Sequence, residues 1–151
     1  MRLGYRARLV VNAVNGSTFI GVLVAAVGRA RLTDGANGLF VAERYRLPVP
    51  TAPAFCVGNV ILTRMDRDAL IGAERLLAHE ARHATQYAWC AGPVMLPLYF
   101  AAAGLSWVLT GDFGSRNVFE RRAGLADGGY RDRPLRPALV RCLRSAPRVG
   151  S

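Results

Sequence analysis

The sequence has no lysine and very little histidine. All 20 basic residues are arginine, only two residues are histidine, and the formal net charge is +10. Positive charge by itself attracts nucleic acid and anionic lipid equally well. Specific nucleic-acid binding would require a basic stripe with interleaved aromatic residues, or a helix-turn-helix or RNA-binding motif, and the sequence contains none of these. We therefore expect no specific nucleic-acid partner.

Cysteine is scarce as well. The three cysteines, Cys56, Cys90 and Cys142, are an odd number at long, irregular spacing. Such spacing fits neither a disulfide framework nor a C-x-x-C metal knuckle. A reducing compartment is the simpler inference, so we expect a cytoplasmic location.

Long uninterrupted hydrophobic runs are also missing. The uncharged run from Leu9 to Gly28 is broken by asparagine, glycine, serine and threonine, and it predicts two short helices with Ser17 as the N-cap of the second. The run from Val94 to Thr110 is more apolar but only 17 residues long. It is marginal as a membrane span and predicts either a buried helix or an interfacial helix that makes a peripheral membrane contact.

The pattern of the remaining chain predicts an α+β fold. After Ala30 the sequence turns extended, with a hairpin around D-G-A-N-G and a third strand at F-C-V-G-N-V-I-L-T. A helix capped by Asp66 or Asp68 then runs to about Cys90. We expect a small antiparallel three-stranded sheet packed on this helix and on two or three further helices. Residues 1–133 would form a single domain, and the Arg- and Pro-rich residues 134–151 a disordered tail.

Both histidines fall within one short stretch, L-L-A-H-E-A-R-H-A-T-Q-Y, from Leu76 to Tyr87. On a helix, residues four apart share one face, so His79 and His83 can bind one metal ion together. Glu80 lies about 100° further round the helix, too far to bind that ion easily but near enough to reach a water on it. Zinc lowers the pKa of such a water to about 7. The stretch predicts a catalytic zinc site, and the alternative is two ordinary surface histidines.

A third ligand is expected downstream, because two histidines do not complete a zinc site. Glu120 is the best candidate: it lies one turn inside a predicted helix that Asn117 caps, and helix-borne carboxylates complete such sites in hydrolases. A solvated position beside two arginines is the alternative for Glu120. The other acids after the motif are Asp112, Asp127 and Asp132.

Two residues are expected to position the metal ligands without binding the metal themselves. Asn117 starts the helix that carries Glu120, and Asp127 falls two turns beyond Glu120. A metal-binding histidine normally donates its second N–H to a carboxylate or carbonyl, and Asp127 is an available acid.

H-E-A-R-H followed by a helix with N-x-x-E resembles the zincin metallopeptidases, in particular the thermolysin-like gluzincins. H-E-A-R-H-A-T-Q is also similar to the H-E-x-x-H-x-x-Q of short bacterial zincin-like domains. The resemblance implies zinc as cofactor, with His79, His83 and Glu120 as its ligands and Glu80 as the general base. It further implies a minimal zincin-like fold in which an edge strand holds an extended peptide by main-chain pairing.

The resemblance is incomplete in two respects. No further histidine is present to stabilise an oxyanion, so we expect Tyr130, or else Tyr87, in that role. The large second domain that shapes the substrate cleft of thermolysin-like enzymes has no counterpart, so the preferred peptide cannot be read from the sequence. The leading hypothesis is a zinc metallopeptidase. The alternatives are a catalytically degenerate zincin-like binding module and a small membrane-associated protein with incidental histidines.

Overall fold

The computed structural model describes residues 3–137 and 140–141. The chain divides into two compact units, Met1–Leu98 and Tyr99–Ser151. The single domain expected over residues 1–133 stays a prediction. Most of the expected tail, residues 138–139 and 142–151, lies outside the described residues.

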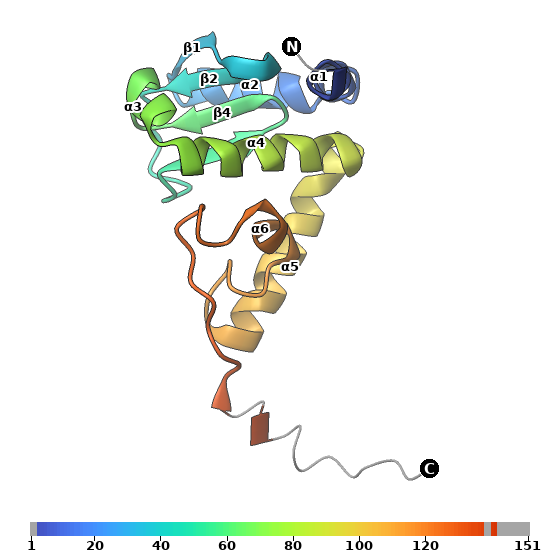
Figure 1. The fold of residues 1–151 in the computed structure, drawn as a ribbon, viewed down its shortest axis with the longest axis vertical. Helices are drawn as coiled ribbons and strands as arrows, with labels where there is room; N and C mark the ends of the chain where they lie inside the picture. Colours follow the sequence, from blue (N-terminus) through green and yellow to red (C-terminus); the bar gives the residue numbers. More distant parts are fainter. Residues whose placement is uncertain (1–2, 138–139, 142–151) are drawn as a thin grey trace. The chain divides into compact units, whose positions relative to one another are not determined.

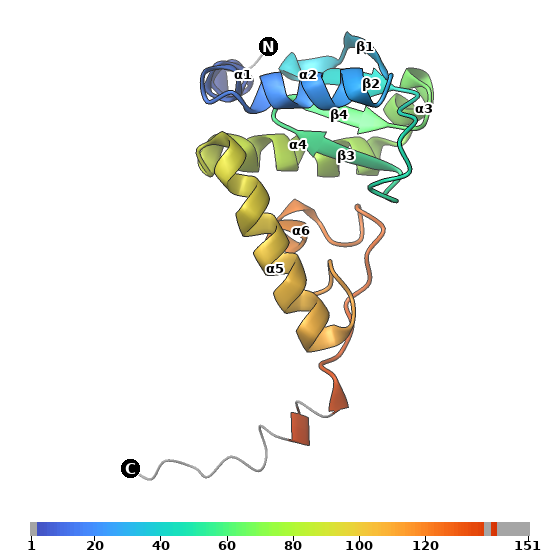
Figure 2. The same cartoon turned by 180° about the vertical axis from the view of Figure 1, so that it is seen from behind.

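The first unit is a mixed α/β structure with three layers. Its principal elements are α1 (Leu3–Val14), α2 (Ser17–Val27), β1 (Arg31–Asp34), β2 (Phe40–Glu43), β3 (Ala54–Val57), β4 (Val60–Thr63), α3 (Arg67–Gly72) and α4 (Glu74–Trp89). The strands form one sheet in the order β1-β2-β4-β3. Helix α2 covers one face of this sheet and α4 the other (Figure 1; Figure 2). Strand β4 is buried along its whole length because both of its faces are covered.

The sheet is mixed, and the prediction of three antiparallel strands is only roughly right. The hairpin around D-G-A-N-G is confirmed: β1 and β2 pair antiparallel, with Arg31 opposite Glu43. The segment predicted as a third strand contains two strands, β3 and β4, which pair antiparallel. Gly58, at φ 63°, begins the two-residue turn between them, a conformation that glycine adopts without steric cost. Strand β4 then pairs parallel with β2.

Helices α1 and α2 bear out the two short helices expected before Gly28, but the cap differs from the prediction. Gly16 is the N-cap residue of α2, in the left-handed conformation at φ 82°. Ser17 is the first helical residue, and its backbone N–H donates to Asn15 Oδ1 at 3.0 Å. The side chain of Asn15 therefore accepts one of the free N–H groups at the start of α2, the kind of role predicted for the side chain of Ser17.

The helix that carries the histidines is shorter than predicted. Ala73, with φ −86° and ψ 61°, separates α3 from α4. Asp66 is the N-cap residue of α3, as predicted, but its carboxylate binds Arg44 Nε at 2.6 Å. The backbone N–H of Arg67 instead donates to Glu43 Oε2 at 2.7 Å. A strand residue thus caps α3, and the motif helix begins only at Glu74.

The core between the sheet and α4 is apolar. Leu39, Val41 and Ile61 of the sheet region pack with Leu70 of α3 and Ala84 of α4. Partly buried Leu76, Leu77 and Ala81 of α4 pack against this cluster. These contacts fix the rotation of α4 about its own axis, and so decide which side of the motif faces inward.

The second unit contains most of α5 (Met95–Thr110) and all of α6 (Val118–Ala123), joined by a loop. A short 3₁₀ turn, Gly92–Val94, precedes α5, so the predicted helix from Val94 to Thr110 is confirmed to within a residue. In the loop, Asp112 Oδ1 accepts the backbone N–H groups of Gly114 and Ser115. The helix expected from Asn117 to Ala126 ends earlier, at Ala123, because Gly124 takes the left-handed conformation.

One continuous helical stretch in the described part of the chain, Gly92–Thr110, is long and apolar enough to cross a membrane. Only 22% of its apolar window is buried within the protein. Core helices of soluble proteins can be equally long and apolar, but they are mostly buried. The low burial of this stretch is compatible with the membrane contact expected from the sequence.

Candidate metal centre

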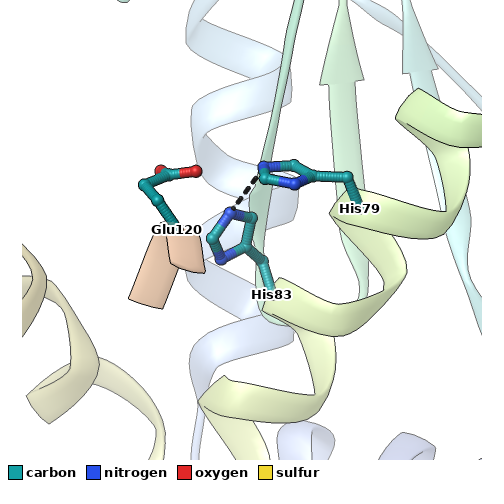
Figure 3. A group of neighbouring side chains, drawn as sticks. All are labelled: His79, His83 and Glu120. Atoms are coloured by element: carbon teal, nitrogen blue, oxygen red, sulfur yellow. Dashed lines mark hydrogen bonds between the residues drawn. The ribbon is translucent and has the colours of Figure 1, made fainter. Parts of the chain in front are cut away.

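The two histidines occupy one buried face of α4. His79 and His83 are 2% and 7% exposed, and Glu80 is 3% exposed, although the sequence around them is polar. Their imidazoles meet edge to face, with 4.6 Å between ring centroids and 85° between ring planes. Figure 3 shows both rings projecting from α4 toward each other. The predicted convergence of the two side chains is therefore present.

The separation of the two ring nitrogens suits a shared metal ion. His79 Nε2 and His83 Nε2 lie 3.0 Å apart. Two nitrogens bound tetrahedrally to one zinc at about 2.0–2.1 Å lie about 3.3 Å from each other. Only a small outward movement would admit the ion. The spacing of the motif thus produces the correct distance as well as the correct face.

Gln86 contacts the ring nitrogen of His83 that faces away from His79. Its Oε1 lies 2.8 Å from His83 Nδ1. An amide oxygen can only accept a hydrogen bond, so this contact favours the tautomer of His83 with the proton on Nδ1 and a lone pair on Nε2. A lone pair 3.0 Å from a second imidazole nitrogen needs a proton or a cation between them. Gln86 is the glutamine of H-E-x-x-H-x-x-Q, so this role had a signal in the sequence.

Glu80 lies beside the histidines on the inward side of α4. Burial first, and the negative charge of Glu80 second, raise the pKa of the Cys56 thiol on β3. Burial, and then the charges of Cys56 and Glu80, also raise the pKa of Tyr87. Both groups stay protonated at neutral pH, so Cys56 does not offer the thiolate that a metal would require. Glu80 is the acid of α4 closest in sequence to the histidines.

Glu120 is held within the second unit by α5 and α6. It lies in the first turn of α6, is 2% exposed, and follows the cap in which Asn117 Oδ1 accepts the Phe119 N–H at 3.0 Å. The capping role predicted for Asn117 is therefore confirmed. The solvated position considered for Glu120 is excluded by its burial. Its carboxylate accepts a hydrogen bond from the Tyr99 hydroxyl of α5.

Tyr99 was missed by reasoning from sequence. Burial, then the charge of Glu120, raise the pKa of Tyr99, as does hydrogen bonding with Glu120 and Tyr130. The hydroxyl therefore stays protonated and donates to the carboxylate. Its only sequence signal is one tyrosine in the apolar segment L-P-L-Y-F, which is equally typical of a packed aromatic residue.

The remaining predicted residues lie in the loops of the second unit. Tyr130 packs its ring against Gly114, where a side chain would collide with it. Asp127 follows α6 in a turn and donates its backbone N–H to Gly124 O. Its expected hydrogen bond to a histidine stays a prediction. Asp132 pairs with Arg116 and Arg121, and Asp112 holds the loop backbone, so both alternative ligands have structural tasks.

Among the described residues, His79, His83 and Glu120 form a buried group that could hold a metal ion (Figure 3). Two imidazoles and one carboxylate are typical of zinc, whereas calcium and magnesium prefer oxygen ligands alone. Comparison with protein-family models, with curated proteins and with solved structures gives no match for this chain.

Proposed function

We propose that the protein is a zinc-dependent peptidase with a minimal gluzincin-like site. The observation that carries this proposal is the buried pair of imidazoles, with Nε2 atoms 3.0 Å apart and a buried carboxylate at the next helix position. A helix that served only as a surface would present these polar groups to water. Burial of three such groups within five residues is costly unless hydrogen bonds or a metal ion compensate for the lost water.

The donor set supports zinc as the cofactor, with His79, His83 and Glu120 as ligands. Gln86 holds His83 in the tautomer that can bind a metal through Nε2. Tyr99 orients Glu120 by donating its hydroxyl proton to the carboxylate. A purely structural zinc usually has four protein ligands rich in cysteine, whereas three ligands leave one position open for chemistry.

Glu80 is assigned as the general base. Zinc, when bound, acidifies a water molecule and polarises the carbonyl of the scissile peptide. Glu80 takes the proton of the attacking water and then delivers it to the departing amine. Tyr130 is assigned to stabilise the oxyanion by donating its phenolic proton. Asp127 is assigned to accept a hydrogen bond from the ring N–H of a metal-binding histidine.

The proposed substrate is an extended segment of peptide or protein. Strand β3 is an edge strand of the sheet. Burial first, and the charge of Glu80 second, raise the pKa of the Cys56 thiol on this strand, so β3 lies near Glu80. Main-chain pairing along β3 would lay a peptide beside the motif helix. We place this activity in the reducing cytoplasm, where Cys56 and Cys90 remain free thiols.

Metal analysis of the purified protein, followed by a hydrolysis assay, tests the proposal. Wild type should contain about one zinc per chain and His79→Ala should contain almost none. A broad peptide library should be cleaved by wild type, and a chelator should stop the cleavage. Tight zinc binding without any hydrolysis would favour the degenerate binding module instead. Absence of zinc from wild type after incubation with the metal would overturn the proposal.

A further inference from the structure

Helix α2 buries small side chains and exposes large apolar ones, the reverse of what a surface helix of a soluble domain does. The residues that it fully buries are Ser17, Gly21 and Ala25, all of which are small. The side chains that it exposes include Phe19 at 71% and Leu23 at 53%. Soluble domains normally place large apolar side chains inward and small or polar ones outward.

This burial pattern follows from close packing of α2 against the sheet. A Cβ added at Gly21 would lie 2.4 Å from Val57 O and 2.9 Å from Val60 Cβ. Helix and sheet can approach this closely only where α2 has no side chain. Phe19, Val22, Leu23 and Val27 project to the other side as a continuous exposed face.

Helix α1 likewise buries a polar side chain and exposes apolar ones. Asn12 is fully buried, and its Nδ2 donates to Ala84 O and to Asn59 Oδ1. Val10, Val11 and Val14 of α1 are exposed, Val14 by 82%. A polar residue that interrupts the hydrophobic run in the sequence therefore forms hydrogen bonds inside the protein. Every exposed residue from Val10 to Val27 is apolar.

Charge at the two ends of this face favours one kind of partner. No charged residue lies between Arg8 and Arg29, and no acid precedes Asp34. Arg6, Arg29 and Arg31 are exposed at the ends of the run. Arginines around an apolar face are complementary to anionic headgroups over acyl chains. A second copy of the chain, also at +10, would bring the same arginines into mutual repulsion.

We infer that the outer face of α1 and α2 binds an anionic lipid bilayer at its interface. The face comprises Val10, Val11, Val14, Phe19, Val22, Leu23 and Val27 and is called the α1–α2 face below. The bend of 73° between the two helices and the 11 residues of α2 favour a position in the interface over a single straight span. This inference does not depend on the proposed peptidase activity.

Vesicle sedimentation with the full chain tests the inference. Wild type should bind vesicles that contain phosphatidylglycerol and should bind pure phosphatidylcholine more weakly. Phe19→Ser combined with Leu23→Ser should lower the partition coefficient at least about tenfold, because two large apolar side chains no longer enter the interface. Ile71→Ser, at an exposed apolar residue of α3 on the other side of the sheet, is the matched control and should bind like wild type. Circular dichroism of both variants should match wild type.

A depth measurement separates lipid insertion from attraction by arginine alone. The Phe19→Trp variant, with Trp89→Phe and Trp107→Phe, should shift its emission to shorter wavelength and be quenched by brominated acyl chains. Ile71→Trp in the same background should show neither effect. Equal binding by wild type and by the Phe19→Ser, Leu23→Ser double variant would overturn the inference. Failure of wild type to bind anionic vesicles, or a dimer that this double variant abolishes, would also overturn it.

Discussion

Helices α2 and α4 lie on opposite faces of the same sheet and bury opposite kinds of side chain. Helix α4 fully buries His79, Glu80 and His83, whereas the fully buried residues of α2 are small ones such as Gly21 and Ala25. Helix α2 departs from the usual arrangement of large apolar side chains inside, and α4 departs from it by burying three ionisable side chains beside its apolar ones. The buried histidines of α4 belong to a group that could hold a metal ion, whereas the large side chains of α2 are left exposed.

The energetic demands on the two helices also differ. Burying imidazole and carboxylate groups is unfavourable unless hydrogen bonds or a metal compensate. Exposing Phe19 and Leu23 forgoes roughly 1.5–3 kcal/mol for each side chain relative to burial. We propose that an ion binds at the buried histidines of α4 and that a bilayer contacts the exposed apolar side chains of α2. The following predictions test each side of this comparison.

The largest effect is expected at Glu80. Glu80→Gln should lower hydrolysis by at least about 100-fold, because glutamine cannot take a proton from the attacking water. Zinc content, measured by atomic absorption, should remain that of wild type. Glu74→Gln, at an exposed acid in the first turn of α4, is the matched control and should retain full activity. Loss of zinc from Glu80→Gln would show that Glu80 is a ligand and not the base.

Removal of the carboxylate ligand should have the next largest effect. Glu120→Gln should weaken zinc binding at least about tenfold in a competition titration with a chromophoric chelator. Asp132→Asn, at an acid that is 53% exposed and pairs with surface arginines, should leave the affinity unchanged. An unchanged affinity in Glu120→Gln would transfer the role to Asp112 or Asp127.

A smaller change is expected when the orientation of one histidine is lost. Gln86→Leu removes the acceptor of His83 Nδ1 and should weaken zinc binding about tenfold. Thr85→Val, which removes a hydroxyl that bonds only to its own helix at Ala81 O, serves as the neighbouring control. Equal affinities in the two variants would mean that packing of α4 alone orients the ring.

The smallest effect concerns the packing of α2. Gly21→Ala should lower the free energy of unfolding by about 1 kcal/mol, because the added methyl collides with the backbone of β3. Gly104→Ala, within α5 and with nothing near its Cβ position, should instead stabilise the protein by up to about 1 kcal/mol. Urea denaturation of both variants measures the difference. Stabilisation by Gly21→Ala would contradict the close approach of α2 to the sheet.

Local spacing accounts for what could be predicted of the site. The convergence of His79 and His83 follows from 3.6 residues per turn once a helix is assumed. The cap at Asn117 and the hairpin after Ala30 are likewise short-range patterns. Each of these depends on a few adjacent residues, so each can be recognised without knowledge of the rest of the chain.

Longer-range contacts account for what could not be predicted. The turn at Gly58 was not recognised because the residues on both of its sides are β-branched or apolar and read as one strand. The division of the motif helix at Ala73 accompanies a cap supplied by Glu43, a residue 24 positions before Arg67. The hydrogen bond from Tyr99 to Glu120 likewise joins α5 to α6.

The sequence by itself determined the motif, its helical spacing and the uncharged runs on either side of it. Tertiary structure decided which face of each helix is buried. Helical periodicity relates residues to one another around an axis, but it does not state how that axis is rotated against a sheet. That rotation is set by packing of Leu76, Leu77 and Ala81 in α4 and by the missing side chain of Gly21 in α2. The same physical rule thus buries the histidines of one helix and exposes the phenylalanine of the other.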